Sequence, residues 1–481
     1  MRFVPTLTLI VLATSFSACG RLSSSVSHLK SIPAYTDDIA NPQIQACIDS
    51  RSEIDAKLIC IPGLTIEQEV FSNVPAGYRR LDLKFSQPLD QNYPRGKRFS
   101  QSLILWHKRS NEPMILHTSG YKIFNKQLYL LAQRWQTNQI QVAHRYFEGA
   151  EPEDSPRDWS YLNVIQSAAD FHRIVVALKQ IYPTRWVNNG ASKGGMTSVF
   201  TRRFYPDDFA GTVADVAPLS FAPEDSRYLD FVDSVGGAPL AECRTKLRQL
   251  QGALLERREE FVTRLDPNAR FEHLGSSDVA FEHAVISMPY GFHQYHNVRP
   301  DDPVRCETIP AVDADSGTIW KWLVEASDPN GLSDDEIKVF VPYYYQANTE
   351  LGGSADRIDL FAGLLRHPYN ALMYGPKNVS QIYSQNAMRD IEEWVRVKSE
   401  RIMFVYGEHD PWTAAMFPVR TDAESNRFIV PKGNHSAKFI NLDEPDRAQF
   451  IQNLNRWLDK RMPLSLDGDI TLPLEDPRVP L

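Results

Sequence analysis

Ser192 lies between glycines in the segment 190–194, which reads Gly-Ala-Ser-Lys-Gly. A Gly-x-Ser-x-Gly pattern is typical of a nucleophile elbow, a sharp turn that leads from a strand into a helix and exposes a serine hydroxyl above a sheet. The apolar pair Trp186 and Val187 precedes the pattern, and a helical run, 196–205, follows it. Because the pattern alone also occurs by chance, this context is what identifies Ser192 as a candidate nucleophile.

An acid and a histidine follow the serine in the order that goes with such an elbow. The apolar run 402–406 predicts a buried strand, and the polar segment after it contains Asp410 and, as an alternative acid, Glu408. His435 follows a second predicted strand and is the only histidine after Asp410. Residues just past the ends of parallel strands lie at the edge where α/β sheets form their sites. The order therefore predicts a triad of Ser192, Asp410 and His435.

The predicted triad indicates acyl-transfer chemistry. Ser192 would attack a carbonyl carbon, and His435 would take the serine proton and pass it to the leaving group. Asp410 would hold the imidazole in the required tautomer. We expect no cofactor, because this chemistry needs none, and no metal, because no cysteine pair has the spacing of a zinc site.

The transition state would also need donors for its oxyanion. The backbone N–H of Lys193, directly after the nucleophile, is the first of them. The second would come from the loop 118–121, which ends at Tyr121, or from the hydroxyl of Tyr146. The sequence does not choose between these two sources.

The elements around these residues alternate between strands and helices. Such alternation predicts a parallel sheet covered by helices, an α/β fold. Between residues 222 and 397 the alternation stops and charged amphipathic helices replace it, so we expect a mostly helical cap inserted after the sixth strand. The predicted strands are 79–86, 99–107, 114–117, 139–147, 186–187, 211–221 with its exit loop, 402–406 and 427–430, and the longer predicted helices are 161–182, 196–205, 240–265, 335–350, 390–398 and 444–460.

The composition is that of a globular protein. The chain has 481 residues, of which 42% are hydrophobic and 23% charged, and its net charge is −8. A negative balance gives no sequence-independent attraction to DNA or RNA. Nucleic acid is therefore not an expected partner, and no obligate protein partner is implied.

Residues 1–19 have the parts of an export signal: a positive start, a short apolar run and small residues before the cleavage point. The ending Ser-Ala-Cys-Gly resembles a bacterial lipoprotein cleavage box. The sequence leaves open whether Cys19 is lipidated, as a membrane tether, or the signal is simply removed. In either case we expect an exported bacterial protein that is secreted, periplasmic or held at the outer membrane.

Four further cysteines fit an oxidising compartment. Cys47, Cys60, Cys243 and Cys306 allow three pairings. Proximity along the chain favours Cys47 with Cys60 and Cys243 with Cys306.

Several segments share a pattern with a known family. They are 190–197 at the elbow, 144–147, 161–162 and 407–412, together with 61–63, 289–292 and 343–346. They resemble the exported bacterial tripeptidyl aminopeptidases of the prolyl tri/tetrapeptidyl type, serine peptidases related to prolyl carboxypeptidase and dipeptidyl peptidase II. The resemblance implies an α/β-hydrolase core, a helical cap and release of tripeptides or tetrapeptides from free N-termini of peptides, often after proline. Cys47 and Cys60 depart from the pattern, and so does the start of the chain with its resemblance to a lipoprotein cleavage box.

The predicted organisation follows from these observations. We expect the signal at 1–19, a tether and disulfide-stapled segment at 20–75, the core at 76–221 and 398–465, the cap at 222–397 and a tail at 466–481.

An aminopeptidase must bind a protonated amine, and the acidic loop after the predicted strand 139–147 offers candidates. Glu148 is the first choice and Glu151 the second, although the loop could equally be a solvated surface. Tyr344 could line a pocket for proline or belong to the core. Trp412 could pack on a ring of the substrate.

Two other functions use the same residues. A carboxylesterase or lipase would open esters with the same triad, but the acidic loop favours a cationic substrate over a lipid. A surface binding protein on an inactive hydrolase scaffold would not need an intact Ser192, Asp410 and His435.

Overall fold

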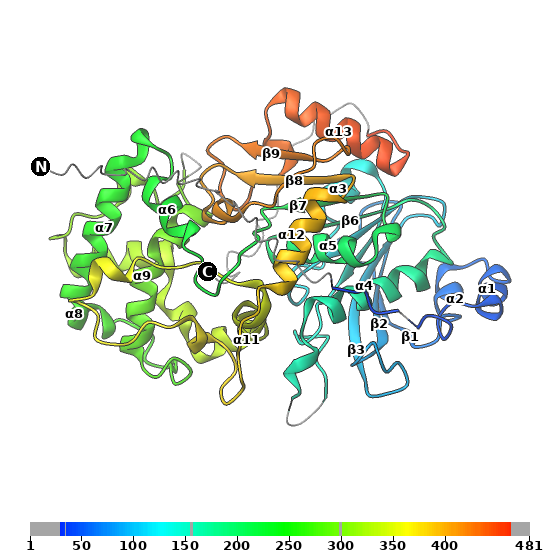
Figure 1. Cartoon of the computed structure of the whole chain (residues 1–481), viewed down its shortest axis with the longest axis horizontal. Coiled ribbons are helices and arrows are strands. Elements are labelled where there is room, and N and C mark those ends of the chain that lie inside the picture. The colour runs from blue at the N-terminus through cyan, green and yellow to red at the C-terminus, as the bar shows by residue number, and fades with distance from the viewer. Residues whose placement is uncertain (1–28, 34, 154–156, 298–300, 463–481) are drawn as a thin grey trace, which may run out of the picture.

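The structure is a computed structural model that describes residues 29–33, 35–153, 157–297 and 301–462. The predicted signal at 1–19, with Cys19, and the predicted tail at 466–481 lie outside these residues. The described chain forms a mixed sheet with helices on both faces, and a group of helices from α6 (Arg227–Ser234) to α11 (Asp334–Gln346) lies beside it (Figure 1). Within the described residues, no helix has the length and apolar character to span a membrane.

A nine-stranded sheet runs through the described residues in the order β1-β2-β3-β5-β4-β6-β7-β8-β9. Strands β1 to β3 pair antiparallel, whereas β4 to β9 run parallel. Every residue of β4, β5, β7 and β8 is buried, as expected for parallel strands covered on both faces. The bounds are β1 (Leu64–Val70), β2 (Arg79–Pro88), β3 (Arg98–His107), β4 (Met114–Thr118), β5 (Asn138–Val142), β6 (Trp186–Ala191), β7 (Gly211–Asp215), β8 (Ile402–Gly407) and β9 (Asn426–Val430).

Helices cover the two faces of the sheet through separate apolar clusters. On one face, α5 and α12 pack with Phe404 of β8, while on the other, α3 and α13 pack with Met403 and Val405. Neighbouring residues of a strand point to opposite faces, so β8 contributes to both clusters. These helices, with those that pack beside them, are α1 (Pro42–Asp49), α2 (Ile54–Leu58), α3 (Leu130–Trp135), α4 (Val164–Lys179), α5 (Lys193–Phe204), α12 (Asn386–Val397) and α13 (Glu444–Leu458).

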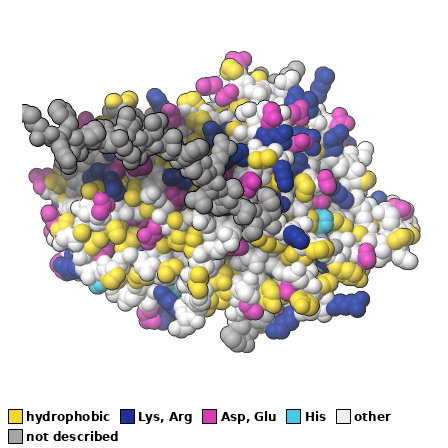
Figure 2. All heavy atoms as spheres, in the orientation of Figure 1, with side chains coloured by type: hydrophobic (Ala, Val, Ile, Leu, Met, Phe, Trp, Pro, Cys, Tyr) yellow, Lys and Arg dark blue, Asp and Glu magenta, His cyan; other side chains and the backbone are white. Residues whose placement is uncertain are grey.

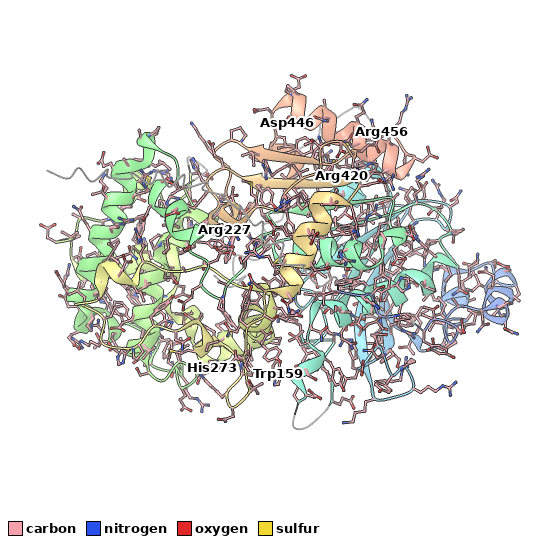
Figure 3. All side chains as sticks on the ribbon, viewed as in Figure 1. Trp159, Arg227, His273, Arg420, Asp446 and Arg456 are labelled. Atoms are coloured by element: carbon pink, nitrogen blue, oxygen red, sulfur yellow. A yellow bond between two sulfur atoms is a disulfide. The ribbon has the colours of Figure 1, made fainter. Side chains whose placement is uncertain are left out.

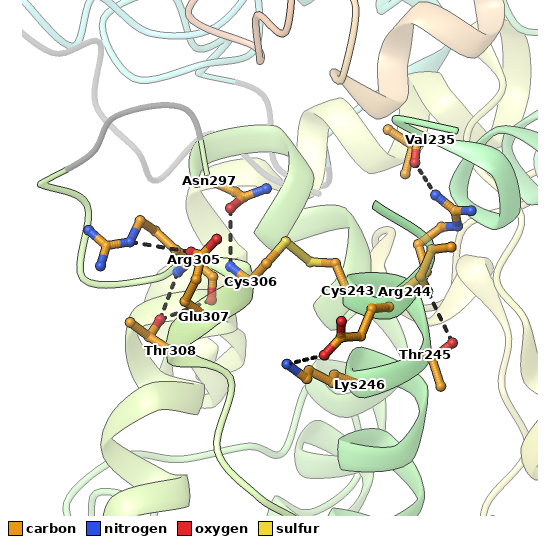
Figure 4. The surroundings of a disulfide bond; sticks show 12 residues. Val235, Cys243, Arg244, Thr245, Lys246, Asn297, Arg305, Cys306, Glu307 and Thr308 are labelled. Carbon is orange, nitrogen blue, oxygen red and sulfur yellow. Dashed lines mark hydrogen bonds and ion pairs between the residues drawn. A yellow bond between two sulfur atoms is a disulfide. The ribbon is translucent and has the colours of Figure 1, made fainter. Parts of the chain in front are cut away.

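A helical cap lies between β7 and β8 in the sequence and has an apolar core of its own, which includes Leu250, Phe281 and Leu323. The disulfide Cys243–Cys306 links α7 to the segment before α10 (Figure 4). A second disulfide, Cys47–Cys60, joins the ends of the α1–α2 pair. Both favoured pairings are therefore confirmed. The cap helices are α6 (Arg227–Ser234), α7 (Ala241–Glu256), α8 (Arg258–Val262), α9 (Ser277–Tyr295), α10 (Ser316–Ser327) and α11 (Asp334–Gln346).

The structure differs from the sequence prediction in several elements. β1 was not predicted, because only its first residue is buried and the strand lies at the edge of the sheet. With β1 counted, the cap follows the seventh strand in chain order. The predicted strand 139–147 ends at Val142, because the chain turns afterwards and Tyr146 adopts a positive φ of 72°. The predicted helix 240–265 is two helices that meet at Arg257.

Candidate active site

Ser192 occupies a strained turn between β6 and α5. Its φ of 54° and ψ of −127° are rare for a residue with a side chain, and its N–H donates to the carbonyl of Asp215 at 2.9 Å. Close packing holds the turn: a Cβ added to Gly194 would lie 2.3 Å from the carbonyl oxygen of Thr118. A Cβ on Gly190 would lie 2.4 Å from the backbone of Gly194. The glycines are required here for close approach, and the turn has the geometry of a nucleophile elbow.

His435 and Asp410 form a buried hydrogen-bonded pair. Nδ1 of His435 lies 2.8 Å from Oδ2 of Asp410, and the other carboxylate oxygen accepts the N–H of Trp412 at 3.2 Å. The backbone N–H of His435 donates to the carbonyl of Gln294 in α9, so the cap helps to hold the loop. Nε2 of His435 is buried and has no hydrogen-bond partner among the described residues. This nitrogen is therefore available to accept a proton.

The carboxylate of Glu408, the alternative acid, binds a different residue from His435. Its side chain is exposed, and its carboxylate accepts the N–H of Lys432 at 2.7 Å. Of the two acids that the sequence offered, the structure brings Asp410 to the histidine.

The loop after β4 packs against the start of α5, next to Ser192. Gly120 has a φ of 73°, and a Cβ there would lie 2.4 Å from the backbone nitrogen of Gly194. Nζ of Lys193 donates to the carbonyl of Gly120 at 2.6 Å, and the N–H of His144 donates to the carbonyl of Tyr121 at 2.8 Å. The loop is thus fixed from both sides.

Two candidate donors for an oxyanion lie in this loop and at the start of α5. The N–H of Lys193 opens α5 and, as the first amide of a helix, has no partner within that helix. The hydroxyl of Tyr121 is electrostatically coupled to the side chain of Ser192, and burial raises its pKa well above the usual value. The hydroxyl of Tyr146, the alternative source, donates to the carbonyl of Asp158.

The side chain of Lys193 is a part of the site that sequence reasoning missed. Burial lowers the pKa of its ammonium group well below the usual value, and Nζ lies 5.6 Å and 5.2 Å from the ring centres of Tyr121 and Phe147. Glu350 adds negative charge nearby, and burial raises the pKa of that carboxyl to about 7. The Gly-x-Ser-x-Gly pattern carries no information on what its variable residues contact. Nothing in the sequence therefore indicated that the side chain of Lys193 is buried beside Tyr121 and Phe147.

The two glutamates predicted to bind the amine lie at the surface of the protein. Glu148 is 73% exposed at its side chain and forms an ion pair with Lys122 at 2.7 Å. Glu151 is half exposed and pairs with Arg157 at 3.3 Å. The structure therefore brings neither carboxylate into contact with the triad.

Of the two predicted aromatic residues, Trp412 lies beside His435. The ring of Trp412 is buried 6.2 Å from that of His435. Tyr344 is partly exposed on α11 and stacks on Tyr374 at 4.7 Å. α11 lies at the junction of cap and core, where Trp159 of the core lies near it (Figure 3); the rings of Trp159 and Tyr345 are 5.2 Å apart.

Charges on the surface are mixed in sign. On the face shown in Figure 2, basic and acidic side chains alternate, and neither sign covers a continuous area.

The parallel sheet, the elbow at its edge, the histidine–carboxylate pair and the helical cap together define a serine hydrolase of the α/β-hydrolase class.

Comparisons with known proteins narrow this class. The chain belongs to the PS-10 peptidase S37 family, whose model matches residues 49–461. It is similar to the prolyl tri/tetrapeptidyl aminopeptidase of Streptomyces mobaraensis, with 34% identity over 420 residues that cover 85% of each chain. The resemblance noted in the sequence is confirmed, and the chain is a serine-type peptidase.

The solved structures that match this chain are more distant. A proline iminopeptidase from Mycobacterium smegmatis matches 78% of this chain and 97% of its own, with 12% identity and a TM-score of 0.39. A proline iminopeptidase-related protein from Thermus thermophilus matches 79% and 99%, with 12% identity and a TM-score of 0.34.

Proposed function

We propose that this peptidase is an exported aminopeptidase that releases tripeptides or tetrapeptides from free N-termini, with proline favoured at the cleavage site. The observation that carries the catalytic part is the buried contact of 2.8 Å between His435 and Asp410, with Nε2 of His435 unpaired among the described residues, in a chain whose Ser192 occupies an elbow. The similarity to a prolyl tri/tetrapeptidyl aminopeptidase supports the length of the product and the preference for proline. Two disulfides and the predicted signal support export.

The proposed reaction proceeds through an acyl-enzyme. Oγ of Ser192 attacks the carbonyl carbon of the third or fourth residue while Nε2 of His435 takes the serine proton. The resulting oxyanion accepts hydrogen bonds from the N–H of Lys193 and from Tyr121. His435 then protonates the nitrogen of the next residue, the peptide bond breaks and the shortened peptide leaves. Water, deprotonated by His435, attacks the ester and frees the product and Ser192.

A proline at the cleavage site fits the surroundings of the triad. Its ring fixes φ near −65°, so less conformational freedom is lost when the substrate binds. The rings near the triad, Trp412 and Tyr343 among them, offer apolar surface for it.

The length of the product is directly testable. A peptide of about ten residues with proline at position three is incubated with the enzyme, and the products are followed by mass spectrometry. We expect the N-terminal tripeptide and the matching shortened peptide as the first products, and slower cleavage when alanine replaces the proline. Single residues, dipeptides or internal fragments as first products would contradict the proposal.

A further inference from the structure

Asp356 lies where the chain of the cap returns to the core. The N–H of Gly353 donates to the carbonyl of Ala222, and the N–H of Asp225 donates to the carbonyl of Gly353, both at 2.9 Å. A β-bridge also joins Ser354 to Asp225. The backbone before Asp356 is thus tied to the loop that follows β7.

The carboxylate of Asp356 lacks a full set of partners. Oδ2 accepts the hydroxyl of Tyr369 at 2.5 Å, whereas Oδ1 is buried with no partner among the described residues. The cation next to it, Arg357, is paired with Asp233 at 2.6 Å. Burial, with the charge of Glu224, raises the pKa of Asp356 to about 6. A buried carboxylate oxygen without a donor is costly, and a cationic ligand would supply the missing partner.

A row of tyrosine rings leads from the nucleophile towards this carboxylate. Tyr121, which follows the loop packed against the start of α5, lies 5.8 Å from Tyr343 between ring centres. Tyr343 lies 5.3 Å from Tyr344, and Tyr344 lies 4.7 Å from Tyr374. The charge of Asp356 contributes to the raised pKa of Tyr374, so the row ends within its electrostatic reach.

A second row starts at the acid of the triad. Trp412 lies 5.4 Å from Tyr228, and Tyr228 lies 6.5 Å from Tyr290 between ring centres. The hydroxyl of Tyr290 donates to the carbonyl of Ala355 at 2.5 Å, next to Asp356.

We propose that Asp356 binds the protonated α-amino group of the peptide substrate. This inference rests on the proposed aminopeptidase function. A carboxylate among tyrosine rings suits an ammonium group, because the ring faces also attract cations. The nearby His283, whose pKa is lowered to about 4 by burial, is neutral and does not compete for the site. Asp356 therefore takes the role that the sequence suggested for Glu148.

The test compares two chromogenic substrates, Ala-Ala-Pro-anilide and its analogue in which hydrogen replaces the α-amino group. Asp356→Asn is expected to lower kcat/KM for the amine substrate by about 100-fold, mainly through KM, and to leave the analogue unchanged. Tyr369→Phe, which removes one hydrogen bond from the carboxylate, is expected to reduce the preference for the amine several-fold. Asp359→Asn is the matched control, because its side chain is 60% exposed, and it is expected to change neither substrate.

The outcomes separate the two proposals. If the wild-type enzyme does not distinguish the two substrates, the aminopeptidase function itself is wrong. If the wild-type enzyme prefers the amine and Asp356→Asn keeps that preference, or loses both activities equally, the role of Asp356 is wrong. Should Asp356→Asn fail to fold, unchanged preference in Tyr369→Phe would overturn the role.

Discussion

Ser192→Ala is expected to lower kcat on peptide substrates by about 10⁶-fold, the loss that follows removal of a triad nucleophile. The hydroxyl is the atom that would form the acyl-enzyme, and alanine has nothing to replace it. Because the side chain is small and the turn is held by the packing of Gly190 and Gly194, the fold is expected to remain intact. Single-turnover rates measure the loss, and thermal unfolding checks the fold.

Ser234→Ala is the matched control for this variant. Ser234 lies exposed at the end of α6, where its hydroxyl donates to the carbonyl of Asp230 at 2.7 Å, and its loss is expected to leave kcat unchanged. Activity that survives in Ser192→Ala at more than a thousandth of the wild-type level would mean that another residue is the nucleophile.

Asp410→Asn is expected to lower kcat by about 10⁴-fold. The carboxylate accepts the Nδ1 proton of His435. The amide NH2 of asparagine would instead donate to Nδ1, which places the proton on Nε2 and leaves His435 unable to accept the proton of Ser192. The change keeps the shape of the side chain, so KM is expected to change little. Steady-state kinetics at neutral pH provide the measurement.

Glu408→Gln separates the two acids that the sequence offered. Glu408 is exposed and its carboxylate binds the N–H of Lys432, so its neutral form is expected to keep kcat within two-fold. A large loss in Glu408→Gln together with full activity in Asp410→Asn would reverse the assignment of the acid.

The turn at Ser192 could be read from the sequence because its requirements are local, whereas the assignment of Asp410 and His435 to the same site stays a prediction. Glycines beside Ser192, a strand before it and a helix after it are all short-range features. Asp410 could be preferred over Glu408 only by position, and the structure shows the physical reason, since the two carboxylates face different partners.

The residues that would contact the bound substrate could not be predicted from the sequence in the same way. Glu148 and Asp356 are both acids in polar segments, and only the fold shows that the first pairs with Lys122 at the surface while the second is tied into the junction of cap and core. Helix α9 was not predicted either, and the reason is a local feature of its sequence. Pro289 lies inside it, although proline usually ends a helix, and this interrupts the sequence pattern.

The most direct test of the account uses Ala-Ala-Pro-anilide with a free N-terminus and its N-acylated twin, each with the wild-type enzyme and Ser192→Ala. The wild-type enzyme is predicted to cleave only the free form, and the variant is predicted to cleave neither. Equal cleavage of both forms by the wild-type enzyme would show that no amine site exists, and would contradict the account of a serine aminopeptidase.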